Sequence, residues 1–201
     1  MKQLSSAIIL DRDGTLCRDA VYLSRFEDFE PLPAVDAALR LLQDEGYRLF
    51  VATNQSGVAR GMFPLSTVEA LNAQIAEYFL ERGVLIEDFA VCPHHPEGTV
   101  PEYTRSCECR KPKPGLLLDL ARKHGLDLSR SYMVGDMARD AEAGLAAGAR
   151  AILIPAVGSE AGSEASSEGA SSLDNNARLK EFKTLLEFAR SVRGVDASHV
   201  C

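Results

Sequence analysis

Short apolar runs alternate with helical patterns along the first three quarters of this chain, and this alternation restricts the fold more than any other feature. Each apolar run is bounded by turn-forming residues, which is typical of a buried strand. Strands that alternate with helices form parallel sheets through right-handed crossovers. We therefore predict an α/β fold, a three-layer Rossmann-like parallel sheet without a large cap domain. The predicted strands lie within 7–10, 47–54, 88–95, 131–136 and 149–155, and the predicted helices within 34–46, 66–83, 114–125 and 138–147.

Composition divides the chain into three parts. Residues 1–155 form the predicted domain, which includes a loop at 92–112 without apolar periodicity. Residues 156–174 are rich in Ser, Gly, Glu and Ala, cannot bury enough apolar surface to offset their ordering entropy, and are predicted to be a flexible linker. Residues 175–201 form the predicted C-terminal helix and tail. One amphipathic helix over 177–192 is expected to dock on the domain or on a partner. Its apolar residues are Leu179, Phe182, Leu185, Leu186 and Ala189.

Charge and hydropathy exclude several classes of protein. The net charge of −7 argues against a nucleic-acid partner, because nucleic-acid binders carry a basic excess. No apolar run reaches 18 residues, so we predict no membrane-spanning helix and no membrane partner. The apolar stretch near the N-terminus is too short for a signal peptide, and we predict a cytoplasmic protein. No coiled-coil seam or long apolar edge is visible, which favours a monomer.

Two carboxylates follow the first predicted strand. Asp11 and Asp13 stand one residue apart where the run at 7–10 ends. Ligands of open α/β sheets bind at the carboxyl ends of the strands. Two close carboxylates repel each other unless a cation lies between them, and Mg²⁺ prefers such oxygen ligands. The pair therefore predicts a Mg²⁺ site, whereas the alternative is an ordinary strand end with solvated acids.

Other polar residues fall at corresponding positions. Two further strands end at Thr53 with Asn54 and at Asp136, and Lys111 lies just before a helix. The carboxyl ends of parallel strands share one edge of the sheet, so we expect these side chains to converge. A carboxylate can attack phosphorus without first losing a proton, and positive charge stabilises the transition state. The set therefore indicates phosphoryl transfer.

A second cluster of reactive side chains lies in the loop at 92–112. Three cysteines and one histidine are the usual composition of a closed structural zinc site. The candidate Zn²⁺ ligands are Cys92, His94, Cys107 and Cys109. His94 is favoured over His95, while a disulfide or uninvolved cysteines are the alternatives. Such a site would fix the base of Arg110 and Lys111 rather than catalyse. Cys17 and Cys201 stand apart and are expected to have no special role.

Four motifs in this order resemble the haloacid dehalogenase (HAD) superfamily of phosphohydrolases. They are Ile8–Thr15, Val51–Asn54, Lys111–Pro112 and Gly135–Asp140. The resemblance implies Asp11 as nucleophile, forming an aspartyl-phosphate, and Asp13 as general acid and base. It also implies Thr53 as a contact to a phosphoryl oxygen and Lys111 as a neutralising cation. Asp136 is implied to bind Mg²⁺ with Asp11 and the main-chain carbonyl of Asp13. For Asp140 a supporting or helix N-terminal role is favoured.

The zinc loop and the segment 54–61 resemble more narrowly the D-glycero-D-manno-heptose-1,7-bisphosphate 7-phosphatases. That resemblance implies hydrolysis of a small phosphorylated sugar, at its 7-phosphate, in the synthesis of nucleotide-activated heptose for surface polysaccharide. Histidinol-phosphate phosphatases share the zinc loop and are the alternative, and a catalytically silent binding module is a third. Where the heptose enzymes often have a basic residue after the metal-binding aspartate, this chain has Met137. The implied substrate-binding residues are Asp19, Tyr22, Thr53, Asn54, Gln55, Ser56, Arg110 and Lys111.

Overall fold

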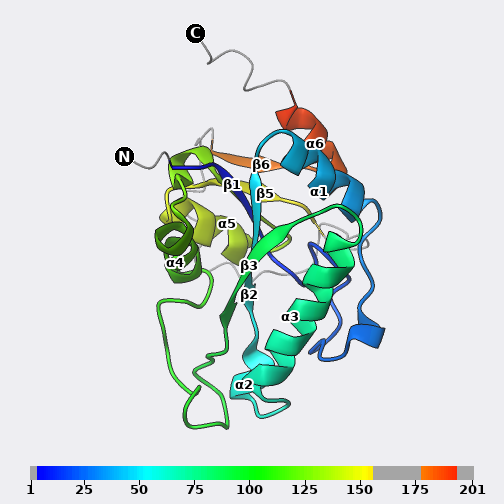
Figure 1. Ribbon diagram of the computed structural model, residues 1–201. Helices are drawn as coiled ribbons and strands as arrows, with labels where there is room; N and C mark the ends of the chain where they lie inside the picture. Colours follow the sequence, from blue (N-terminus) through cyan, green and yellow to red (C-terminus); the bar gives the residue numbers. More distant parts are fainter. Residues whose placement is uncertain (1–3, 156–177, 194–201) are drawn as a thin grey trace.

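The computed structural model describes residues 4–155 and 178–193 (Figure 1), in which six parallel strands form one sheet. The strands are β1 (Ala7–Leu10), β2 (Arg48–Asn54), β3 (Ile86–Cys92), β4 (Tyr132–Gly135), β5 (Arg150–Leu153) and β6 (Leu179–Glu181), in the order β3-β2-β1-β4-β5-β6. β1 and β4 are adjacent at the centre, so the crossover between β3 and β4 carries the chain from one half of the sheet to the other. Ligands bind where the strand order reverses in this way.

Helices cover both faces of the sheet and confirm the predicted three layers. The helices are α1 (Val35–Asp44), α2 (Ser56–Ala59), α3 (Leu65–Leu80), α4 (Gly115–His124), α5 (Ala138–Ala146) and α6 (Leu185–Val192), with short 3-10 turns at Phe26–Asp28 and Leu128–Arg130. Ile8 and Leu10 of β1 face a core with α1, α3 and α6, whereas Ala7 and Ile9 face α4 and α5. This alternation along one strand follows from the period of two residues in β-structure.

Two helices differ from the predictions made from the sequence. α3 begins at Leu65, one residue before the predicted range of 66–83, and its N-cap residue is Pro64 in an extended conformation. α2 follows β2 directly and was not predicted, because its four residues are too few to show a helical period.

The expectation of a single helix over 177–192 is wrong in its first half. Residues Leu179–Glu181 form β6, which pairs with β5 at the sheet edge, and the helix begins only at Leu185. The side chain of Thr184 accepts a hydrogen bond from the backbone of Glu187 and so starts the helix there. α6 packs on α1 and contributes Phe188 to the main core, so this segment docks on the domain. The predicted linker at 156–174 lies outside the described residues.

Within the described parts of the chain, no helix has the length and hydropathy needed to cross a membrane. The cytoplasmic location and the monomeric state stay predictions of the sequence.

Candidate active site

The carboxyl ends of β1 and β4 bring three carboxylates and a lysine together. Lys111 Nζ lies 2.9 Å from Asp11 Oδ1 and 2.7 Å from Asp140 Oδ1. The side chains of Lys111 and Asp140 are fully buried, and that of Asp11 is 5% exposed. Removal of such charges from water is costly unless they are paired, so the lysine and the two carboxylates depend on one another.

Asp136 completes a group of three carboxylates that could hold a metal ion. Oxygens of Asp11, Asp136 and Asp140 all lie within 4.8 Å of one another. Burial raises the pKa of Asp136 to about 6, and the neighbouring charges of Asp11 and Asp140 add to this effect. Its Oδ1 is buried without a hydrogen-bond partner. An unpartnered oxygen beside like charges fits a hard cation such as Mg²⁺.

Two glycines allow these carboxylates to approach the backbone. Gly14 has φ of +83°, and a Cβ atom there would collide with the carboxylate of Asp136. A Cβ atom on Gly135 would collide in the same way with the side chain of Asp140. Only glycine combines a positive φ with the room that Asp136 needs, which explains why Gly14 follows Asp13 in the motif Ile8–Thr15.

The side chain of Asp13 accepts hydrogen bonds from Arg12 and Gln55. Arg12 donates from Nε and Nη2 to its two oxygens at 3.1 and 3.0 Å, and Gln55 Nε2 donates to Oδ2 at 2.8 Å. Arg12 is itself buried, and its Nη1 donates to Asn72 Oδ1 on α3 at 3.0 Å. These contacts orient Asp13 without Lys111, which contacts Asp11 and Asp140.

Asn54 positions Lys111. Its Nδ2 donates to the carbonyl oxygen of Lys111 at 3.0 Å, and its Oδ1 accepts from the Lys111 N–H at 3.1 Å. Because both polar atoms of the amide are engaged, Asn54 fixes the backbone from which the buried lysine extends. Thr53 is buried beside it and accepts a hydrogen bond from Gln55 Nε2 at 2.8 Å.

A cleft of about 260 Å³ opens above these groups. Tyr22 on its rim has φ of +60°, a conformation that a non-glycine residue keeps only when its surroundings impose it. A Cβ atom on Gly57 would lie 3.0 Å from the Tyr22 ring, so the tyrosine packs directly on that backbone. The lining residues are Asp11, Asp13, Asp19, Ala20, Val21, Tyr22, Leu23, Thr53, Asn54, Gln55, Ser56 and Arg139.

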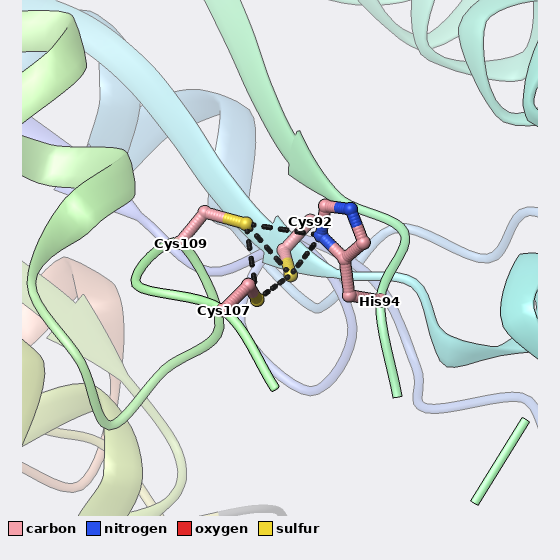
Figure 2. Close-up of side chains that lie close together, drawn as sticks. All are labelled: Cys92, His94, Cys107 and Cys109. Atoms are coloured by element: carbon pink, nitrogen blue, oxygen red, sulfur yellow. Dashed lines mark hydrogen bonds between the residues drawn. The ribbon is translucent and has the colours of Figure 1, made fainter. Parts of the chain in front are cut away.

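The four predicted Zn²⁺ ligands meet at the end of β3 (Figure 2). Cys109 Sγ lies 3.2 Å from Cys92 Sγ, 3.3 Å from Cys107 Sγ and 3.3 Å from His94 Nδ1. Four ligands at zinc-bond lengths around a tetrahedral ion stand roughly 3.5–3.8 Å apart, close to these separations. His95 instead contacts Arg60, so His94 is the histidine that lies with the three cysteines. This group could hold a metal ion, and no disulfide links the described cysteines.

The cysteine loop is joined to the carboxylate cluster through the backbone. Cys109 is followed at once by Arg110 and Lys111, and Arg110 Nη1 donates to the carbonyl oxygen of His94 at 3.2 Å. The backbone of Gly115 at the start of α4 lies against the carbonyl of Glu108, where a Cβ atom would collide. The loop is thus fixed on both sides of Lys111, whose peptide bond to Pro112 is cis.

Most of the predicted site residues converge as expected. Arg110 and Lys111 do not line the cleft itself, but Lys111 lies buried beneath it and contacts Asp11. Sequence reasoning gave no role to Arg12 or Arg139 and favoured a minor one for Asp140, which in fact pairs with Lys111. Asp140 is the last residue of the motif Gly135–Asp140, and this position was the only sequence signal for its pairing with Lys111. Nothing in the local pattern marks Arg139.

Comparison with known proteins identifies phosphatases among the relatives of this chain. A family model described as "HAD-hyrolase-like" matches residues 108–173. The D-glycero-beta-D-manno-heptose-1,7-bisphosphate 7-phosphatase of Rhodopseudomonas palustris is 45% identical over 142 residues, which cover 71% of this chain and 79% of the relative. The enzyme of the same name from Escherichia coli K12 is 43% identical over 141 residues, covering 70% and 74%.

A solved structure with the same arrangement is also similar. It is the D,D-heptose 1,7-bisphosphate phosphatase of B. bronchiseptica, crystallised with magnesium and phosphate. It is 27% identical, with a TM-score of 0.74, and the match covers 92% of this chain and 97% of that one.

Proposed function

The chain belongs to the D-glycero-beta-D-manno-heptose-1,7-bisphosphate 7-phosphatase family of HAD-like hydrolases, and we propose that it removes the 7-phosphate of a heptose 1,7-bisphosphate and leaves the 1-phosphate in place. The main observation behind this proposal is that the buried Lys111 forms ion pairs with both Asp11 and Asp140 beneath an open cleft. A silent binding module has no need of this costly buried arrangement, so we do not favour that alternative.

We assign the first chemical step to Asp11. Its Oδ1 is held by the N–H of Arg12 at 2.7 Å and by Lys111. Its second oxygen attacks the phosphorus of the 7-phosphate, a new P–O bond forms to Asp11, and the bond to the sugar oxygen breaks. Asp13 gives its proton to that departing oxygen. Lys111 and Thr53 stabilise the charge on the phosphoryl oxygens.

The second step returns both aspartates to their starting state. Asp13, now a carboxylate, takes a proton from a water molecule, and the resulting hydroxide oxygen attacks phosphorus. The bond to Asp11 breaks, and inorganic phosphate is released. Gln55 and Arg12 keep Asp13 directed at the same place in both steps through their hydrogen bonds.

We propose Mg²⁺ as the cation held by Asp11 and Asp136, with the main-chain carbonyl of Asp13 as a further ligand. When bound, it would neutralise part of the charge on the phosphoryl group. Asp140 lies near enough to contribute, but its ion pair with Lys111 favours a supporting role.

Steady-state comparison of two substrates tests the assignment. We expect kcat/KM for D-glycero-D-manno-heptose 1,7-bisphosphate to exceed that for histidinol phosphate at least about tenfold, since each missing charged contact weakens binding by roughly that factor. Phosphate release is the readout, and Asp11→Asn protein from the same preparation controls for contaminating phosphatases. Equal or better turnover of histidinol phosphate would assign the chain to the other activity.

We further propose that the cysteine loop holds Zn²⁺ in a structural role. Gently purified protein should contain about one equivalent of zinc, and Cys107→Ser should lose it. We expect the variant to melt at a lower temperature and to lose phosphatase activity, because the segment that carries Lys111 loses its anchor. Metal analysis and thermal melting are the measurements. Cys17→Ala, a buried cysteine outside the cluster, should keep its zinc, whereas less than about half an equivalent in wild-type protein would contradict the proposal.

A further inference from the structure

Arg139 has a position in the cleft that the proposed chemistry leaves unused. It lies in the first turn of α5, three residues after Asp136, and lines the cleft together with Asp19 and Ser56. The other charged side chains of the lining are carboxylates, so Arg139 is the single cation among the described lining residues. The described part of the chain offers it no ion pair within 4.0 Å.

Neither Lys111 nor Met137 can bind a second anion in place of Arg139. The ammonium group of Lys111 already contacts Asp11 and Asp140 and lies buried beneath the cleft. Met137, directly after Asp136, is 45% exposed but carries no charge. When the first phosphate of a bisphosphate lies over Asp11, the second needs another cation in the same cleft, and Arg139 is the one that the described lining provides.

We propose that Arg139 binds the phosphate group that is not hydrolysed and thereby selects a bisphosphate over a monophosphate. This inference rests on the proposed function, because it assigns one further contact to the same substrate. A guanidinium group suits the task, since its fork of N–H donors matches two phosphate oxygens.

Arg139→Ala tests the proposal when two substrates are compared. We expect kcat/KM for heptose 1,7-bisphosphate to fall about 10- to 100-fold, mainly through a higher KM, because a charged hydrogen bond is lost. For heptose 7-phosphate, which lacks the second phosphate, the change should stay below about threefold. Arg139→Lys should keep part of the preference, since it retains the charge but loses the fork.

Arg122→Ala is the matched control, because Arg122 is an exposed arginine on α4 outside the cleft. It should leave both substrates unchanged. An equal fall for both substrates with Arg139→Ala, or no fall for either, would overturn the role of Arg139. Failure of the wild-type protein to hydrolyse any heptose 1,7-bisphosphate would instead refute the proposed function. That result is distinguishable from a failure of the role proposed for Arg139.

Discussion

Asp11→Asn should lower kcat for phosphate release by at least about 10³-fold, the largest effect we expect from any single substitution. An amide is a far weaker nucleophile than a carboxylate, so no acyl-phosphate can form in the first step. The side chains have nearly the same shape, and the amide oxygen of the asparagine would still accept the hydrogen bond from the Arg12 N–H. Acid-quenched wild-type protein should carry covalent phosphate from labelled substrate, whereas the variant should carry none.

The same variant should remain folded, and this separates a chemical role from a structural one. In this variant Lys111 keeps its ion pair with Asp140. The charge of Asp11 also contributes to the raised pKa of Asp136, so its removal relieves repulsion among the three carboxylates. We expect the free energy of unfolding in urea without added metal to stay within about 1 kcal/mol of wild type. Asp119→Asn, at an exposed acid on α4, serves as the control. Undiminished phosphate release by Asp11→Asn would exclude Asp11 as the nucleophile.

Lys111→Met should cause the largest loss of stability. The substitution leaves Asp11 and Asp140 buried without their cation, and removing one partner of a buried ion pair costs about 3–5 kcal/mol. Urea unfolding near pH 7 measures this loss. Activity should fall about 10²- to 10³-fold as well, because a positive group that stabilises the transition state is gone.

The pH dependence of that loss identifies its cause. Burial raises the pKa of Asp140, and Lys111 opposes this, so the variant should raise that pKa further. A carboxyl whose folded pKa is raised favours folding at low pH and loses that contribution as pH rises through the folded pKa. The stability deficit of Lys111→Met should therefore be smaller near pH 4 than at pH 7.

Lys113→Met is the matched control for this variant. Lys113 lies two residues away and pairs with Glu108, but its side chain is 48% exposed. Exposed ion pairs contribute about 1 kcal/mol or less, so we expect little change in either stability or activity. Comparable losses in the two variants would show that the loop as a whole, rather than the buried ion pair, determines stability.

The carboxyl-terminal segment shows where reasoning from sequence reached its limit. The apolar residues of 177–192 fit a helical period, yet residues Leu179–Glu181 pair with β5. A three-residue strand is too short to show an alternating pattern, and its pairing depends on an open edge at β5, which only the assembled sheet provides. By contrast, all five strands of the first 155 residues were predicted from apolar runs bounded by turn signals, although β3 begins at Ile86, before the predicted range of 88–95.

The order of strands and helices, the aspartate pair at the end of β1 and the Cys₃His composition of the loop were determined by the sequence itself, because periodicity and close spacing are local properties of a chain. Tertiary structure alone decided that Asp140 pairs with Lys111, that Asn54 holds the Lys111 backbone and that Arg12 reaches Asn72. These last two contacts join residues 57 and 60 positions apart. Such contacts depend on strand register and on the paths of the crossovers, which bring distant carboxyl ends to one edge of the sheet.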